Sequence, residues 1–283
     1  MATTPQTTVG DDYVLKTGKS GAERLRLLDK VYGRSTRRLL LEAGLRPGMR
    51  VLDVACGVGT VTCWIAEQVG ERGAVVAADI SPDQLAVARE TCASCEGLRP
   101  VEFIEASAYD TGLPAESFDL VHTRLLLCHL NHPEDAVAEF YRLLKPGGVF
   151  VCHDLYLSGM LSVPLTSAWT RSMEIAHALG RSIGVDYDHG LKLPTRLLEA
   201  GFGSPEVSFD MPVYMRGPEK RLWELTFAEA ESAIVHAGVA TADEVQDLAA
   251  QMKIEAEDET TLMVPYPLLG AWAAKQPGVH EAI

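Results

Sequence analysis

The residues best placed to do chemistry lie in the segment VLDVACGVGT (51–60) and in an acid that follows it. Gly57 and Gly59 remove Cβ atoms where a strand-like run turns into a helical pattern, so a ligand can approach the backbone closely. The first N–H groups of the following helix point to the same place. Asp79 lies 20 residues beyond Gly59 (79 − 59), the offset at which a carboxylate reaches the ribose hydroxyls of an adenosine cofactor. This spacing predicts a nucleoside-binding loop.

Asp53, inside the same apolar run, indicates what kind of nucleoside cofactor binds. A carboxylate within a buried strand is costly unless a partner compensates for its charge. A dinucleotide fingerprint gives no reason for this acid, and it has a third glycine where this chain has Thr62. A cofactor with a cationic group in place of a pyrophosphate accounts for both observations. The alternative is a structural Asp53 that accepts hydrogen bonds from the loop's own amides, and it stays open at this point.

The elements that must position these residues alternate regularly between residues 49 and 156. Short runs rich in Val, Ile and Leu predict strands at 50–55, 74–80, 101–106, 118–123 and 149–156. Helical patterns between them cover 61–69, 82–93 and 133–144. Buried strands separated by helices are typical of a parallel sheet covered on both faces. The predicted fold class is therefore α/β, doubly wound and Rossmann-like, with an amphipathic helix at 21–44 before it.

Several ordered motifs within residues 45–155 resemble those of class I S-adenosylmethionine-dependent methyltransferases. Outside that span, Tyr13 and the helix at 21–28 are similar to the amino-terminal lid of the branch that modifies small natural products. VLDVACGVGT is similar to the first motif of that family, with Ala55 at a position often held by glycine. AADISPDQLAVAR (77–89) resembles the second motif, and LLKPGG (143–148) resembles the turn before the fifth strand. Thr123 and Arg124 stand where the family often carries a Ser-Arg pair.

The resemblance implies S-adenosyl-L-methionine as cofactor and S-adenosyl-L-homocysteine as product. Asp79 is expected to bind the ribose, with Ile80 and Gln84 flanking the adenine. Ser107 and Ala108 replace a common Asp-Ala pair, so a weaker hydroxyl hydrogen bond to the adenine amine is expected. Arg124 is expected beside the methionine moiety. The complete expected cofactor set is Asp53, Ala55, Gly57, Gly59, Asp79, Ile80, Gln84, Ser107, Ala108 and Arg124.

The resemblance also implies a seven-stranded sheet with an antiparallel final strand, which we place within TLMVPYPLLGAWAAK (261–275). Beyond residue 156 a strand is predicted near 205–212, and helical patterns fall near 160–180, 194–200, 217–237 and 241–256. We expect one catalytic domain in three parts. These are a tail with lid helices (1–44), a cofactor-binding core (45–156), and the last strands with a helical substrate cap (157–283).

The expected reaction is an in-line displacement in which a small acceptor takes the methyl group, and catalysis comes mainly from positioning. An acceptor hydroxyl or amine also needs a base. The candidate catalytic residues are His153, which ends a predicted strand, and Tyr13 in the lid. A role for His153 in bonding backbone or cofactor instead stays open. His129 is expected in the cofactor wall and His122 in the core.

Aromatic residues in the variable parts of the chain favour a hydrophobic or aromatic acceptor, methylated on oxygen, carbon or nitrogen. The candidates for its pocket are Tyr13, Trp169, Tyr187, Tyr214, Trp223 and Phe227. One alternative is an enzyme that binds the cofactor but catalyses a cyclisation or rearrangement without methyl transfer. Another is a binding or regulatory protein with a vestigial pocket, against which the intact Asp53, Gly57, Gly59 and Asp79 argue.

Composition narrows the partners and the compartment. The chain of 283 residues has 25 Lys or Arg and 39 Asp or Glu, and this formal charge of −14 disfavours nucleic acid and anionic membrane surfaces. No run approaches the ~18 apolar residues of a membrane span, and no export signal is recognisable, so a cytoplasmic protein is expected. Six scattered cysteines predict reduced thiols and no metal site. Self-association is left open.

Overall fold

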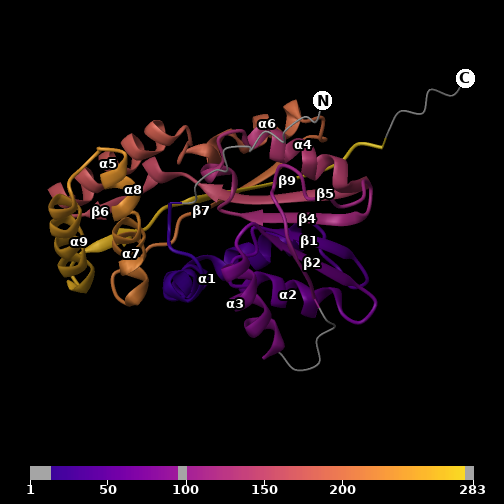
Figure 1. Ribbon diagram of the computed structural model, residues 1–283, viewed down its shortest axis with the longest axis horizontal. Helices are drawn as coiled ribbons and strands as arrows, with labels where there is room; N and C mark the ends of the chain where they lie inside the picture. Colours follow the sequence, from indigo (N-terminus) through magenta and orange to yellow (C-terminus); the bar gives the residue numbers. More distant parts are fainter. Residues whose placement is uncertain (1–13, 95–100, 278–283) are drawn as a thin grey trace, which may run out of the picture.

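The computed structural model describes residues 14–94 and 101–277 and is built around a seven-stranded sheet of order β3-β2-β1-β4-β5-β9-β7 (Figure 1). The parallel strands are β1 (Arg50–Val54), β2 (Ala74–Asp79), β3 (Glu102–Glu105), β4 (Phe118–Arg124) and β5 (Leu144–Leu155). β9 (Leu268–Ala274) runs antiparallel to both β5 and β7 (Glu206–Asp210). The predicted doubly wound α/β fold, with an antiparallel strand inside 261–275, is confirmed.

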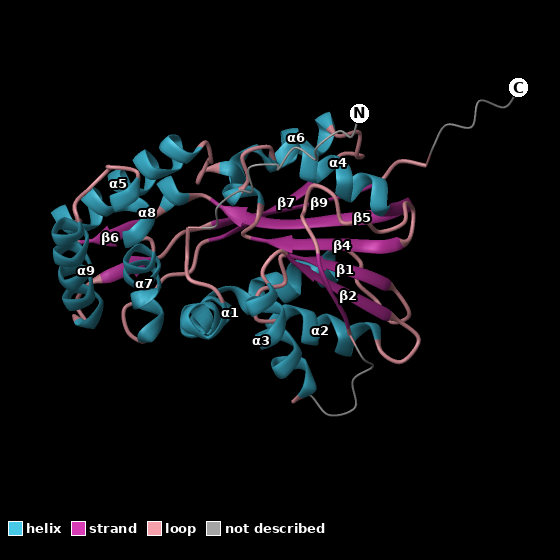
Figure 2. Ribbon diagram, in the orientation of Figure 1, coloured by secondary structure: helices cyan, strands magenta, loops and turns pink. Residues whose placement is uncertain are grey.

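Helices cover both faces of this sheet, as the alternating pattern requires (Figure 2). One face carries α1 (Gly18–Glu42), α2 (Thr60–Val69) and α3 (Pro82–Ala93), and the other carries α4 (Pro133–Leu143) and α6 (Leu193–Glu199). Leu40 of α1, Val51 of β1 and Ile65 of α2 are fully buried in one apolar cluster. Phe140 of α4 and Phe150 of β5 belong to a cluster on the opposite face. Burial of these side chains on both faces is what fixes the sheet in the middle.

A helical cap lies beyond one end of the sheet (Figure 1). It consists of α5 (Ser167–Ile183), α7 (Leu222–Glu229), α8 (Glu231–His236) and α9 (Ala242–Glu257), with the two-stranded sheet of β6 (Leu161–Val163) and β8 (Leu262–Val264). Single turns of 3-10 helix occur at η1 (Leu127–His129), η2 (Leu157–Gly159), η3 (His189–Lys192) and η4 (Pro218–Arg221). Trp169 and Ile175 are buried in the apolar core of the cap. In the described ranges no helix is both long and apolar enough to cross a membrane.

The prediction that all cysteines are reduced thiols is wrong for two of them. Cys63 of α2 and Cys92 of α3 form a disulfide, with their Cα atoms 5.4 Å apart. The two helices pack side by side on the same face of the sheet, which brings together residues 29 positions apart in the sequence. Cys56, Cys128 and Cys152 are free thiols.

Candidate active site

The loop between β1 and α2 adopts backbone conformations that favour glycine. Gly57 has a φ of 55° and Gly59 a φ of 79°, in the left-handed region that costs other residues roughly 1–2 kcal/mol. A Cβ atom on Gly59 would lie 3.0 Å from the Cβ and 3.1 Å from the Cα of Ala88 on α3. Ala55 carries the same strain at φ 56°, and such strain often accompanies ligand sites. Gly59 therefore lets the loop pack directly on α3.

Asp79, at the end of β2, ties this loop to the neighbouring strand. Its carboxylate accepts hydrogen bonds from the N–H groups of Gly57 and Ser81, both at 2.9 Å. Burial raises the pKa of Asp79, and the two backbone hydrogen bonds act in the opposite direction. Each carboxylate oxygen has a lone pair to spare, which suits the side chain to accept hydrogen bonds from two ribose hydroxyls.

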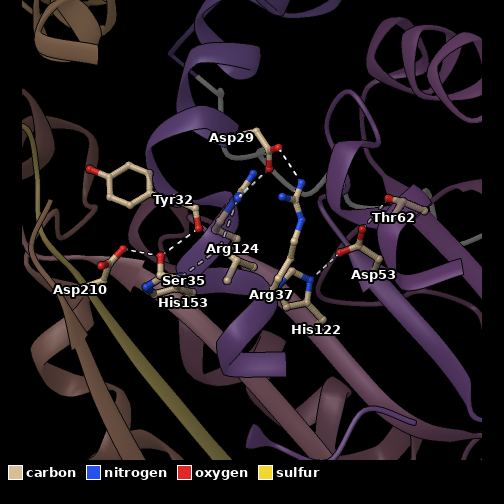
Figure 3. Close-up of polar contacts among 11 residues, drawn as sticks. Asp29, Tyr32, Ser35, Arg37, Asp53, Thr62, His122, Arg124, His153 and Asp210 are labelled. Atoms are coloured by element: carbon tan, nitrogen blue, oxygen red, sulfur yellow. Dashed lines mark hydrogen bonds and ion pairs between the residues drawn. The ribbon is translucent and has the colours of Figure 1, made fainter. Parts of the chain in front are cut away.

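Asp53 finds its partners inside the protein (Figure 3). Thr62 Oγ1 donates to it at 2.5 Å, and the Nδ1 atom of His122 lies 2.7 Å from its other oxygen. The parallel pairing of β1 with β4 places Asp53 directly opposite His122, which is buried as expected. The buried Asp53 carboxylate thus has hydrogen-bond partners among the protein's own side chains, Thr62 and His122, and neither of these partners is a backbone amide of the loop.

These residues face a cavity of about 1000 Å³ that extends from the glycine loop into the cap. Nine of the ten expected cofactor-binding residues line it, namely Asp53, Ala55, Gly57, Asp79, Ile80, Gln84, Ser107, Ala108 and Arg124. Gly59 instead supports the loop from behind, against α3. The hydroxyl of Ser107 accepts a hydrogen bond from the N–H of Tyr109 at 3.2 Å. The structure therefore brings together, at one end of the cavity, residues that the sequence spreads over three motifs.

The other end of the cavity is apolar and belongs largely to the cap. Its lining includes Leu157, Leu179, Tyr187, Trp223, Phe227, Ala230, Ile234 and Tyr266. Three of the predicted aromatic residues are thus present, whereas Trp169 is buried in the cap core and Tyr214 pairs with β8, so neither lines the cavity. The cavity lining also includes Val14 and Leu15, whereas Tyr13 lies outside the described residues.

Arg24 of α1 is a cavity residue that the sequence does not reveal. Its side chain is only 3% exposed, and its Nε donates to Glu229 of α7 at 2.7 Å. This ion pair connects the helix at the amino-terminal end of the described chain with the cap, beside the apolar half of the cavity. One Arg among Leu residues on an amphipathic helix is usually solvent-exposed, so its burial depends on tertiary packing alone.

Two histidines differ sharply in their access to the cavity. His129, at the end of η1, lines it and makes an edge contact with Tyr187, with ring centroids 5.8 Å apart. Burial, together with the charge of Arg24, lowers the pKa of His129 to about 4, so the imidazole is neutral at neutral pH.

The expectation that His153 acts as base is not met by its position. Its Nδ1 atom lies 3.2 Å from Thr36 Oγ1, and the side chain faces α1 without lining the cavity (Figure 3).

Arg124 belongs, with Asp29, Thr36 and His153, to a layer of polar side chains between the sheet and α1 (Figure 3). Its Nη1 atom donates to Asp29 Oδ1 at 3.4 Å and to Thr36 Oγ1 at 3.3 Å. Burial lowers the pKa of Arg124 and the Asp29 carboxylate raises it, which leaves a cation. Since Arg124 also lines the cavity, this layer presents a positive charge to a ligand bound over β4.

Comparison with known proteins finds a methyltransferase-like stretch within the chain. Residues 52–152 match the sequence profile of a family described as a methyltransferase domain. Over this range the chain is similar to methyltransferase domains. The matched range includes the end of β1 from Leu52, the glycine loop, Asp79, the Ser107–Ala108 pair and Arg124, which line the polar end of the cavity.

Curated relatives share this domain over part of their length. The ubiquinone/menaquinone biosynthesis C-methyltransferase UbiE of Ectopseudomonas mendocina is 41% identical over 38% of this chain and 41% of its own length. That of Escherichia fergusonii is 33% identical over 52% of this chain and 58% of its own. A candidate methyltransferase from Bacillus halodurans C-125 has the same fold, with a TM-score of 0.59 and 23% identity, covering 85% of this chain and 98% of that one. The chain thus spans about half the length of these curated relatives.

Proposed function

We propose that this protein transfers the methyl group of S-adenosylmethionine to a small, uncharged and largely apolar acceptor. The observation that carries the proposal is the continuity of the cavity from the glycine loop to the aromatic wall of the cap. A cofactor at the loop and an acceptor against the cap would then share one enclosed space. Proximity and orientation of this kind supply ~7–11 kcal/mol of a displacement barrier.

The residues at the polar end fit the cofactor. The Asp79 carboxylate would accept the ribose hydroxyls, and the buried Gln84 lines the wall beside the adenine position. The Arg124 cation would pair with the carboxylate of the methionine moiety, which would take the place of Asp29 as the hydrogen-bond acceptor. When bound, S-adenosylmethionine supplies a methyl group activated by its positive sulfur.

The apolar end sets the acceptor class. Aliphatic and aromatic side chains form most of its wall, and the Arg24 cation is neutralised by Glu229. The neutral His129 imidazole can accept or donate one hydrogen bond, which suits an acceptor hydroxyl that must be oriented or must lose its proton. A charged acceptor would lose its hydration in the cavity and would find no free opposite charge among these wall residues, which makes its binding unfavourable.

Incubation with methyl-labelled S-adenosylmethionine and a panel of quinones, phenols, terpenoids and amines tests the proposal. Quinone acceptors come first because the curated relatives are quinone-biosynthesis methyltransferases. We expect label in at least one apolar acceptor, together with S-adenosylhomocysteine. An Asp79→Asn variant, with weakened cofactor binding, is the matched control. Calorimetric cofactor binding without label transfer to any acceptor would contradict the proposal. Product formed without S-adenosylhomocysteine would favour a cyclisation or rearrangement instead.

A further inference from the structure

The outermost strand of the sheet directs apolar side chains toward solvent. Five alternate residues on β7 and the segment after it are between 40% and 55% exposed, namely Val207, Phe209, Met211, Val213 and Met215. We call these residues the β7 row. The residues between them, Ser208, Asp210, Pro212 and Tyr214, are half-buried. A sheet with one solvated face normally places apolar residues inward and polar residues outward. The reversed pattern indicates a contact surface rather than a solvent surface.

The β7 row lies at a free edge and continues onto a second sheet. Among the described residues β7 pairs with β9 alone. Tyr214 pairs with Met263 of β8, so Met215 stands opposite Leu262, and Leu262 in turn pairs with Val163 of β6. Val163 is 55% exposed, and Leu165 two residues later is 68% exposed. The apolar surface therefore extends from the edge of the main sheet across the small sheet of the cap.

The area of this surface is close to what a stable dimer needs. The five residues of the β7 row with Val163 and Leu165 are each roughly half exposed, so together they present on the order of 600–700 Å² of apolar area, against about 800 Å² per partner in a standard interface. No charged residue belongs to the β7 row. Two copies that each carry a formal charge of −14 can therefore approach here without placing like charges in contact.

The charges at the two ends of the row have opposite signs, which suits contact with a second copy of the same chain. The exposed Glu206 precedes the row, and Arg216, 74% exposed and paired with Glu259 of its own chain at 3.0 Å, follows it. If two rows lie antiparallel about a two-fold axis at Met211, Val207 meets Met215 and Phe209 meets Val213 of the other copy. The same register places Glu206 opposite Arg216 twice, once at each end. An isologous contact of this kind closes on itself.

We propose that the β7 row is the contact surface of a two-fold symmetric homodimer centred on Met211. The cofactor loop lies at the other side of the sheet order, in the β1 region, so each copy keeps its own cavity. The proposal is independent of the methyl-transfer reaction, because it rests on residues outside the cavity lining.

Sedimentation velocity on the full chain tests the proposal, with the mass of one chain being 30.7 kDa. We expect a species of twice that mass for the natural sequence. Met211→Lys places two like charges on the axis and should weaken dimerisation on the order of 100-fold. Ile254→Lys, at a position on α9 that is 69% exposed and outside the row, is the matched control and should remain dimeric. Arg216→Glu should weaken the dimer a few-fold, and adding Glu206→Arg should restore it.

A Met211→Cys variant gives a second measurement that does not depend on a destabilising charge. Mild oxidation should link two copies through residue 211, whereas Ile254→Cys should stay unlinked under the same conditions. A natural chain that remains monomeric at micromolar concentrations would overturn the proposal. So would a Met211→Lys variant that dimerises as tightly as the natural chain.

Discussion

Substitution of Gly59 by alanine tests whether the cofactor loop depends on close packing against α3. The added Cβ would meet Ala88 at 3.0 Å from its Cβ and 3.1 Å from its Cα, and part of that contact is backbone that cannot rotate away. Gly44 is the matched control, because it also has a positive φ (92°), and a Cβ added there would have no other atom within 4 Å. The two variants therefore share a backbone cost and differ in a steric cost.

The magnitudes follow from these two costs. Alanine in the left-handed region loses roughly 1–2 kcal/mol, and both variants should show that loss. Overpacking of a tight contact adds typically about 1–3 kcal/mol, which applies to Gly59→Ala alone. Any shift of the loop also displaces the Gly57 N–H from Asp79, which it now reaches at 2.9 Å. We therefore expect Gly59→Ala to bind S-adenosylmethionine at least about tenfold more weakly, a difference of ~1.4 kcal/mol.

Chemical denaturation and calorimetric titration of the natural chain and both variants provide the measurement. The free energy of unfolding should fall in both variants, and further in Gly59→Ala. Cofactor affinity should fall in Gly59→Ala and stay unchanged in Gly44→Ala. Equal destabilisation of the two variants, with natural cofactor affinity in both, would refute the inferred role of the contact between Gly59 and Ala88.

Three further predictions concern charge. Asp79→Asn should lower cofactor affinity about tenfold to a hundredfold in calorimetry, because charge-assisted hydrogen bonds to a ligand contribute ~1.5–3 kcal/mol, and it should leave the fold intact by circular dichroism. Arg24→Met leaves the Glu229 carboxylate largely buried without its partner and should destabilise the protein by about 2–4 kcal/mol in denaturant titrations, whereas the double variant Arg24→Met/Glu229→Gln should recover much of this loss. Burial lowers the pKa of His153 from its ordinary value of 6.5 to about 3, so the folded state disfavours protonation of the imidazole. The free energy of unfolding should therefore fall as the pH drops below 6.5, by roughly 3 kcal/mol at pH 4. A pH series of unfolding curves in which His153→Gln loses as much stability as the natural chain would contradict this.

The cofactor half of the site could be predicted from the sequence because its signals are local. Gly57 and Gly59 sit within one turn, and Asp79 follows at a spacing set by one helix and one strand. The strands and helices between residues 50 and 155 are regular enough that their order alone places these residues together at the carboxyl ends of neighbouring strands. The contact of Asp53 with His122 could not be predicted, because it depends on the register between two strands whose residues are 69 positions apart.

The acceptor half could not be predicted because it depends on contacts between distant segments. The sequence places His153 near the carboxyl end of a strand, where a base is expected, but β5 continues to Leu155 and the alternation of the strand turns His153 toward α1. Trp169 and Trp223 look alike in the sequence, but only Trp223 lines the cavity. The burial of Arg24 and the disulfide between Cys63 and Cys92 arise from helix packing that leaves no trace in spacing.

The position of β9 has a consequence for how the protein is made. β9 is synthesised after every other strand, but it lies between β5 and β7 in the sheet. Until residues 268–274 leave the ribosome, β5 keeps an unpaired edge and β7 has no strand to join. A sheet that forms on the nascent chain therefore has an open edge throughout the synthesis of the helical cap, and an open edge of this kind can pair with another chain.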